Sequence, residues 1–180
     1  PVTATITVNP EIPGANVRTF TGALTTSDPS LTTRLFRDGI PSTCAVPKVY
    51  PGTSGAGPIY YDTYTVTNTT GATQCVSVSY WVTGTGNAFV TAYNGSFVPT
   101  NLGTNYLADG GSSSLDATPV TFSLNGTNGQ SIVFVVNNYL ASGTTTGYTM
   151  TVTGLPLTGC PGTPSTFTYT VNPTPKVNDV

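Results

Sequence analysis

An alternation of apolar residues with threonine stands near the start of the chain, in Val2-Thr-Ala-Thr-Ile-Thr-Val8. Successive side chains of a β-strand point to opposite faces, so this period of two predicts a strand with one apolar face and one hydroxyl face. Thr, Val, Tyr and Phe favour such pleated surfaces. The same pattern, or a short apolar run of strand length, returns in seven further segments: 60–66, 76–82, 88–93, 120–124, 132–136, 148–152 and 167–171.

Clusters of Gly, Pro and Asn separate these segments, and no part of the chain shows a helical pattern. Strands joined by short turns pair antiparallel, whereas parallel strands need long crossover connections. The sequence therefore predicts an all-β protein, an antiparallel β-sandwich of jelly-roll or immunoglobulin-like type. Within it, Asn125-Gly126 predicts a hairpin turn, because both residues tolerate positive φ.

The composition excludes most enzyme mechanisms. The 180 residues are only 7% charged, carry a net charge of −2 and include no histidine. Without imidazole there is no histidine base, no Ser–His or Cys–His nucleophile pair and no histidine-built metal site. The seven acidic residues do not form a recognisable pair of the kind that glycosidases use. We therefore expect a protein that is not an enzyme.

Charge and hydropathy also limit the classes of partner that we expect. Five basic residues are spread too thinly to neutralise a phosphate backbone, so we expect no nucleic acid partner. The longest apolar run, Ile132 to Val136, has strand length, whereas a membrane helix needs about 20 residues. We therefore expect no membrane insertion.

Cysteine usage indicates an oxidising compartment. Cys44 and Cys75 lie at the edges of strand-like segments and can form one disulfide, which leaves Cys160 over. The alternative is three reduced, buried thiols. Few lysines and 37 threonines also fit an extracellular setting, as do three triplets of glycosylation type at Asn68, Asn94 and Asn125. The chain starts at Pro1 without Met or a signal segment, which suggests a processed or excised piece of something longer.

Six pieces of the central sequence occur in a characteristic order: 22–29, 60–66, 92–102, 107–109, 133–136 and 147–154. In this order the region from about residue 18 to residue 155 resembles the bacterial pre-peptidase C-terminal type of domain. The resemblance implies a secreted β-sandwich of the kind found beside peptidase domains and in long surface proteins.

The two ends echo each other, since Ala4-Thr-Ile-Thr-Val-Asn-Pro10 returns as Thr168-Tyr-Thr-Val-Asn-Pro173. Together, residues 1–10 and 159–180 are similar to the immunoglobulin-like, PKD-like repeats of giant bacterial adhesins, including gliding adhesins. The resemblance implies a sandwich at residues 18–155, inserted into one such repeat whose strands and linkers are residues 1–17 and 156–180.

The end segments supply only two clear strands, and a two-stranded ribbon is marginal in water. Either they add to an edge of the central sandwich, or they complete a sandwich with a neighbouring repeat or subunit by strand addition. The proline-rich exit after each strand favours the second arrangement. We expect six residues to mark these inter-unit strands: Val2, Ile6, Val8, Phe167, Tyr169 and Val171.

Calcium is the one metal that the composition permits, because it binds carboxylate and carbonyl oxygens. The resemblance implies it too, since some relatives of the central domain bind it. The best candidate ligands are Asp109 with Asp62 or Asp116, although Gly110 stands where the family often has a second acid. A turn-forming role is the competing interpretation of Asp109. We expect no other cofactor.

Several aromatic residues are candidates for stacking on sugar rings: Tyr80, Trp81, Tyr93, Tyr106 and Tyr139. Packing in the core and at its rim is the competing interpretation. Adjacent Tyr80 and Trp81 must point to opposite faces of a strand.

Arg34 and Arg37 are candidates for binding an acidic partner. The alternative is that they pair with Asp28, Asp38 or loop carbonyls.

The resulting hypothesis is a non-enzymatic structural repeat or subunit of an extracellular bacterial adhesin or surface fibre. Its partners would be neighbouring copies or repeats, joined by β-strand addition, with surface glycans as a further candidate. The alternative is a carbohydrate-binding accessory module of a secreted hydrolase.

Overall fold

The computed structural model describes residues 2–8, 17–138, 145–155 and 165–171. It divides the chain into two compact units, one of residues Ala15–Leu157 and one of residues Pro1–Gly14 with Thr158–Val180. Every element in the described residues is a strand, and none is a helix.

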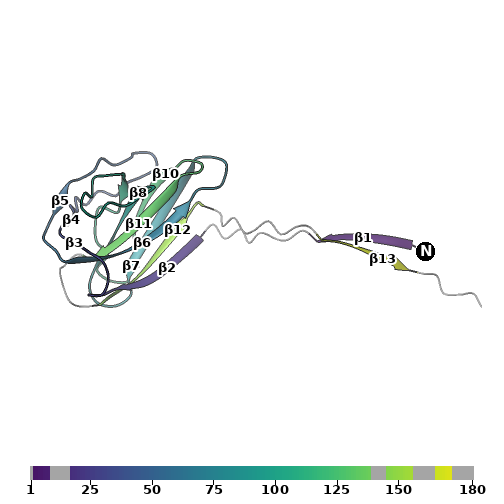
Figure 1. Ribbon diagram of the computed structural model, residues 1–180, viewed down its shortest axis with the longest axis horizontal. Coiled ribbons are helices and arrows are strands. Elements are labelled where there is room, and N and C mark those ends of the chain that lie inside the picture. The colour runs from purple at the N-terminus through teal and green to yellow at the C-terminus, as the bar shows by residue number, and fades with distance from the viewer. Residues whose placement is uncertain (1, 9–16, 139–144, 156–164, 172–180) are drawn as a thin grey trace, which may run out of the picture. The chain divides into compact units, whose positions relative to one another are not determined.

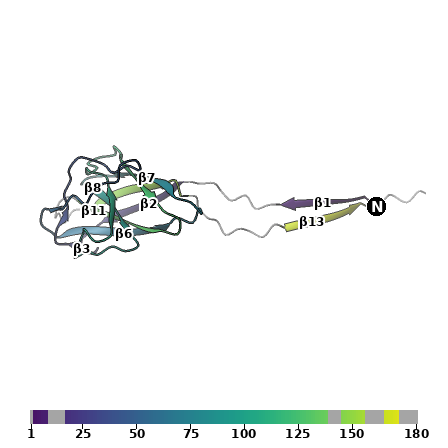
Figure 2. The same cartoon turned by 90° about the horizontal axis from the view of Figure 1, so that it is seen from above.

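Two antiparallel sheets pack against each other in the larger unit (Figure 1, Figure 2). The four-stranded sheet has the order β10 (Val120–Gly126), β7 (Gln74–Val82), β12 (Thr146–Thr153), β2 (Val17–Leu24). The five-stranded sheet has the order β3 (Ser30–Leu31), β6 (Ile59–Thr67), β11 (Ser131–Asn138), β8 (Ala88–Asn94), β9 (Tyr106–Asp109). Two short strands, β4 (Arg34–Leu35) and β5 (Thr53–Ser54), pair separately. The predicted all-β antiparallel sandwich is confirmed.

The smaller unit is a ribbon of two antiparallel strands, β1 (Val2–Val8) and β13 (Ser165–Val171). All seven residues of each strand are paired, from Val2 opposite Val171 to Val8 opposite Ser165.

The main core lies between the two sheets. In β7 the alternate residues Val76, Val78, Tyr80 and Val82 are at most 1% exposed, while the serines between them are half-buried. Large side chains of the facing strands, such as Phe134, complete this core. Burying each such side chain stabilises the folded state by about 1.5–3 kcal/mol. This gain explains why every second residue of a strand with one face in the core is apolar.

A second apolar layer covers the outer face of the five-stranded sheet. Residues of β11 are buried on both faces, because Ile132 and Phe134 enter the main core while Val133 and Val135 pack with Tyr93. Next to them, two residues of β6 and β8 and three from short strands and a loop form a cluster of Ile59, Phe89, Leu31, Leu35 and Leu102. A strand buried on both sides reads as a continuous apolar run rather than an alternation, as residues 132–136 do.

All eight strand segments expected from the sequence are present, and the prediction of a hairpin turn at Asn125-Gly126 is wrong. Both residues lie inside β10, opposite Cys75 and Gln74 of β7. The next strand, β11, belongs to the other sheet, so the connection crosses between layers instead of folding back. The positive φ falls at Gly129, at 77°.

Candidate functional site

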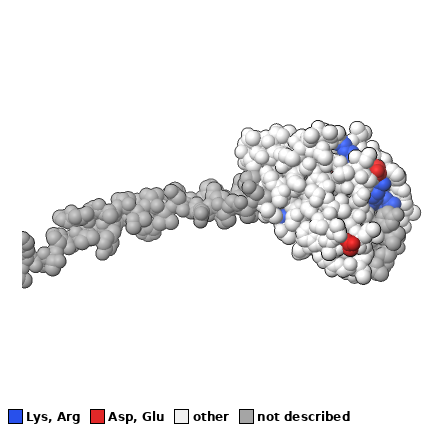
Figure 3. Space-filling model, turned by 180° about the vertical axis from the view of Figure 1, so that it is seen from behind, with Lys and Arg blue, Asp and Glu red and all other residues white. Residues whose placement is uncertain are grey.

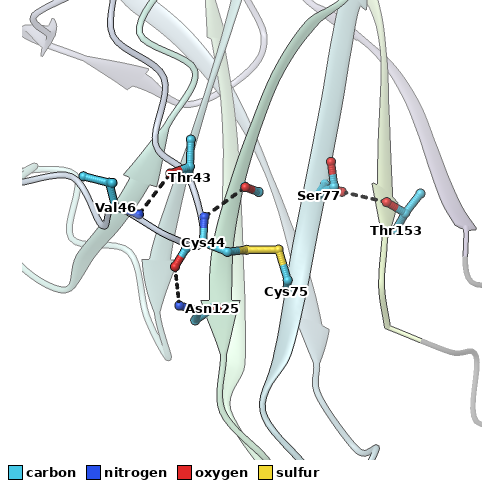
Figure 4. Close-up of a disulfide and its surroundings, with 8 residues drawn as sticks. Thr43, Cys44, Val46, Cys75, Ser77, Asn125 and Thr153 are labelled. Carbon is cyan, nitrogen blue, oxygen red and sulfur yellow. Dashed lines mark hydrogen bonds between the residues drawn. A yellow bond between two sulfur atoms is a disulfide. The ribbon is translucent and has the colours of Figure 1, made fainter.

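A disulfide joins Cys44 to Cys75, as the sequence predicted, with their Cα atoms 5.8 Å apart. Cys44 lies in the long loop between β4 and β5, and Cys75 lies in β7 (Figure 4). The alternative of three reduced thiols is therefore wrong for these two residues. Cys160 lies outside the described residues.

The segment 42–44, which we call the clasp, bridges the two sheets at one side of the sandwich. The Ser42 amide donates to the Asp109 carbonyl in β9 (3.0 Å), and the Ser42 carbonyl accepts from the Ser123 amide in β10 (2.9 Å). The Asn125 side-chain amide donates to the Cys44 carbonyl (2.8 Å). Because β9 and β10 are the edge strands of their sheets, the clasp occupies backbone groups that an open edge would leave unpaired.

Asp109 is completely buried beside the clasp, and both of its carboxylate oxygens accept hydrogen bonds. Its Oδ1 accepts from Lys48 Nζ (2.7 Å) and from the Gly111 amide (2.6 Å). Its Oδ2 accepts from the Tyr106 hydroxyl (2.6 Å). Lys48 also donates to Asp38 Oδ1 at 2.6 Å. A buried charge needs such partners, since removing one leaves an uncompensated charge in the interior.

The protonation of this cluster follows from its surroundings. Burial raises the pKa of Tyr106, and the Asp109 carboxylate raises it further, so the phenol remains a hydrogen-bond donor. Burial of Asp38 alone would raise its pKa, but the hydrogen bonds from Lys48 and the Ile40 amide outweigh this and lower it. Asp38 is therefore a carboxylate at neutral pH.

The opposite side of the sandwich holds a second polar contact between the sheets. Tyr148 of β12 donates to Asp62 Oδ2 of β6 at 2.5 Å, and its hydroxyl also bonds the Tyr64 hydroxyl at 2.6 Å. Burial raises the pKa of Asp62, and the bond from Tyr148 partly opposes that rise. Gly22 of β2 leaves room for this arrangement, because a Cβ there would collide with the Tyr148 ring.

The three carboxylates proposed for calcium do not lie together. Asp62 and Asp109 belong to one sheet but are separated by three strand spacings, roughly 14 Å. Asp116 is exposed in the loop after β9, where its Oδ1 accepts from the Thr118 amide at 2.7 Å. No group of three potential metal-ligating side chains occurs in residues 17–138 and 145–155. These residues do not fit one calcium site, and Asp109 Oδ1 is instead bonded to Lys48 Nζ.

The aromatic residues that were candidates for stacking on sugar rings do not form an exposed surface among the described residues. Tyr80 and Tyr93 are fully buried, and Tyr106 is bonded to Asp109. Trp81 is half-buried on the face of β7 opposite to Tyr80, as strand geometry predicted. Tyr139 lies outside the described residues. In the part of the chain whose side chains are described, every tyrosine and Trp81 is buried or half-buried, so these residues do not form an exposed stacking row.

The two arginines bond to their own loop. Arg34 and Arg37 both donate to the Leu35 carbonyl, at 3.0 and 2.7 Å. The Arg37 guanidinium also lies 4.0 Å from the centre of the Phe89 ring and donates to Ser113. These contacts match the interpretation in which the arginines bind loop carbonyls. On the face shown in Figure 3 charged groups are few, and most of them stand in separate small spots.

The expected inter-unit strands pair with each other, and the β1–β13 sheet holds no other strand of the described chain. Ile6 stands opposite Phe167, and Ala4 stands opposite Tyr169. Alternate residues share a face, so Val2, Ala4, Ile6 and Val8 and their partners lie on one face, and paired threonines lie on the other. All six marker residues therefore belong to a single face of the ribbon.

Sequence reasoning missed Lys48 and Tyr148 as members of polar clusters. Each is separated from its partner by a long stretch of chain, 61 residues for Lys48 and Asp109 and 86 for Tyr148 and Asp62. No short motif can report a contact over such separations.

Comparison with known proteins finds no family model and no curated protein that matches this chain. Among the described residues, no helix has the length and apolar character needed to cross a membrane.

Proposed function

We propose that this chain is a non-enzymatic structural repeat or subunit of an extracellular bacterial adhesin or surface fibre. Neighbouring copies or repeats join it by β-strand addition at the β1–β13 ribbon. The disulfide supports an oxidising, extracellular setting. The observation that carries the proposal is the ribbon itself, in which both end segments of the sequence form one small sheet.

The ribbon is too small to be stable alone. Isolated two-stranded ribbons are marginal in water, and three or more strands with a covered apolar face are needed for independent stability. The register places Val, Ala, Ile, Phe and Tyr positions on one face, with Ser165 as the one hydroxyl residue among them. Such a face needs a cover that two strands do not provide.

The dimensions of the ribbon favour strand addition over simple stacking of two faces. Seven residues span about 24 Å and two strands about 10 Å, which gives a face of roughly 240 Å². A stable protein interface needs about 800 Å² from each partner. No other described strand pairs with the edges of the ribbon, and strands added there enlarge the sheet and pair the backbone groups of those edges.

Size-exclusion chromatography with light scattering tests the proposal on the full 180-residue chain. We expect association that increases with concentration, and we expect a chain without residues 165–173 to remain monomeric while its sandwich stays folded. A full chain that remains monomeric at all concentrations would contradict the proposal.

Neighbouring residues on opposite faces of β1 provide a matched control. Replacing Ile6 by Lys places a charge on the apolar face and should weaken association by about tenfold or more, since burying such a side chain contributes about 1.5–3 kcal/mol. Thr5→Lys on the threonine face should change it by less than about threefold. Equal effects of the two changes would argue against a buried apolar face.

The carbohydrate-binding alternative has no specific support in the described residues. Its expected feature is a row of exposed aromatic side chains, and the candidates are buried, half-buried or engaged in polar contacts.

A further inference from the structure

The contact between Lys48 and Asp109 has the geometry of two groups that can react. Lys48 Nζ lies 2.7 Å from Asp109 Oδ1 and 2.6 Å from Asp38 Oδ1. The Lys48 side chain is 8% exposed and the Asp109 side chain 0%. A primary amine, a carboxyl group and a second carboxylate thus meet in a site that excludes most water.

Aromatic and apolar side chains surround the two groups. Tyr106, which bonds to Asp109, packs with Tyr50 and against an apolar cluster that contains Phe89 and Leu102. Asp38 Oδ1 contacts the same Nζ and is the group to which Lys48 can give up a proton. A neutral amine is a nucleophile, whereas an ammonium is not. For groups held with their reacting atoms well oriented, effective concentrations reach about 10⁵–10⁸ M.

We propose that Lys48 and Asp109 condense in the folded protein to form an intramolecular isopeptide bond, with Asp38 as the group that relays the protons. This inference is independent of the function proposed above. It assigns to the cluster a covalent modification that needs no second protein.

The condensation balances without any further reactant. Asp38 accepts a proton from Lys48, and the Nζ lone pair attacks Cγ of Asp109, so that an N–C bond forms. The bond from Cγ to Oδ1 then breaks, and Oδ1 leaves as water with the two protons that the ammonium has lost. One ammonium and one carboxylate become one neutral amide and one water, and nothing is oxidised or reduced.

Two neighbouring donors stabilise the developing charge. The Tyr106 hydroxyl donates to Oδ2, which becomes the amide oxygen and carries negative charge in the tetrahedral intermediate. The Gly111 amide donates to Oδ1, the oxygen that leaves. Both donors are already in place in the folded protein, so no rearrangement is needed to orient them.

The bond would complete a covalent connection between the sheets. The disulfide ties the loop to β7 of the four-stranded sheet through Cys44. The isopeptide bond would tie the same loop to β9 of the five-stranded sheet, only four residues later, through Lys48. The two sheets could then not separate at this edge without breaking a covalent bond.

Mass spectrometry of the full, purified chain tests the proposal. We expect the mass to be lower than that of the disulfide-bonded sequence by one water, and a proteolytic fragment to join Lys48 to Asp109. Amine labelling after denaturation should modify Lys176, the other lysine of the chain, but not Lys48. A mass without the loss of water, together with a labelled Lys48, would overturn the proposal and leave an ion pair only.

Three variants distinguish loss of the condensation reaction from loss of folding. Lys48→Arg retains a cation but lacks the reactive amine and should restore the lost water, while Lys176→Arg should keep the cross-link. Asp38→Asn keeps both reacting groups and should slow the condensation by about 100-fold or more, as expected for loss of a general base. Condensation of Asp38→Asn at the rate of the unmodified chain would overturn the role of Asp38. Since the unmodified chain alone decides whether the bond exists, a variant that fails to fold does not leave the question open.

Discussion

Tyr148 shows how one side chain connects two layers. Its ring is 1% exposed in the main core, while its hydroxyl reaches across to Asp62 and Tyr64 of the other sheet. A buried hydroxyl must find partners, because an unsatisfied one costs about 1–3 kcal/mol. Here the partners belong to the facing sheet, so satisfying Tyr148 also sets how β12 and β6 lie against each other.

Replacing Tyr148 by Phe should lower the free energy of unfolding by about 1–2 kcal/mol, because Asp62 and Tyr64 lose a hydrogen-bond partner. It should also raise the pKa of Asp62 further, since the bond from Tyr148 is what lowers it. Urea denaturation measures the first effect, and NMR titration of the Asp62 carboxyl measures the second. Tyr60→Phe is the matched control, because the Tyr60 hydroxyl has no hydrogen-bond partner among the described residues.

The pH dependence of this contact has a definite sign. Burial raises the pKa of Asp62 above its ordinary value of 3.8, so the folded chain keeps this proton to a higher pH than the unfolded chain does. The stabilisation from Asp62 is therefore full below pH 3.8 and is lost as the pH rises through the folded-state pKa. Tyr148→Phe should move the upper limit of this window to higher pH, and an unchanged window would contradict the assigned bond.

At the scale of elements, the clasp explains how a long loop becomes part of the sandwich. The loop between β4 and β5 has no regular strand, yet Ser42 pairs with β9 and β10 on either side of it. Cys44, two residues after Ser42, attaches the same loop to β7 through the disulfide. One short segment thus covers two sheet edges that would otherwise be exposed.

Replacing both Cys44 and Cys75 by Ala should reduce the free energy of unfolding by about 3–4 kcal/mol. The bridge closes a sequence separation of 31 residues, and a loop of this length loses about that much unfolded-state entropy when cross-linked. Equilibrium urea unfolding of the double variant measures the loss. Cys160→Ala retains the bridge and serves as the control. A loss below about 1 kcal/mol would show that the clasp is held mainly by its hydrogen bonds.

The sequence predicts some strands more clearly than others. Strand β7 alternates cleanly because one of its faces enters the core. Strand β2 was not predicted, although its eight residues pair with β12 along their full length. It is an edge strand in which Gly22 replaces a large residue to make room for Tyr148, so its apolar pattern is weak. Asn125-Gly126 led to the opposite error, a turn predicted where a strand continues, because this turn-forming pair lies inside the regular strand β10.

At the scale of the whole molecule, the chain consists of one well-packed unit and one thin ribbon. The buried residues of the main core and of the outer apolar layer all come from residues 24–155. The clasp, the disulfide and both polar clusters belong to the same range. The larger unit therefore has everything that a stable domain requires.

A chain limited to residues 15–157 should fold on its own. We expect cooperative thermal unfolding with a midpoint within about 5 °C of that of the sandwich in the full chain, since a change of 1 kcal/mol shifts the midpoint by only a few degrees. Differential scanning calorimetry and near-ultraviolet circular dichroism provide the measurements. Non-cooperative unfolding of this fragment would mean that the end strands are needed for the packing of the sandwich.

The sequence alone determined the fold class and eight of the strands, because alternation and turn residues act over short distances along the chain. It also indicated the Cys44–Cys75 disulfide, while three reduced thiols stayed the alternative until the structure placed the two cysteines together. Only the tertiary structure decided that Asp109 is bonded to Lys48 and Tyr106, that Asp62 lies far from it, and that the two end strands pair with each other. These relations join residues distant in sequence, and they depend on which strands become neighbours in each sheet. That choice is made by packing of the whole core, which no local pattern records.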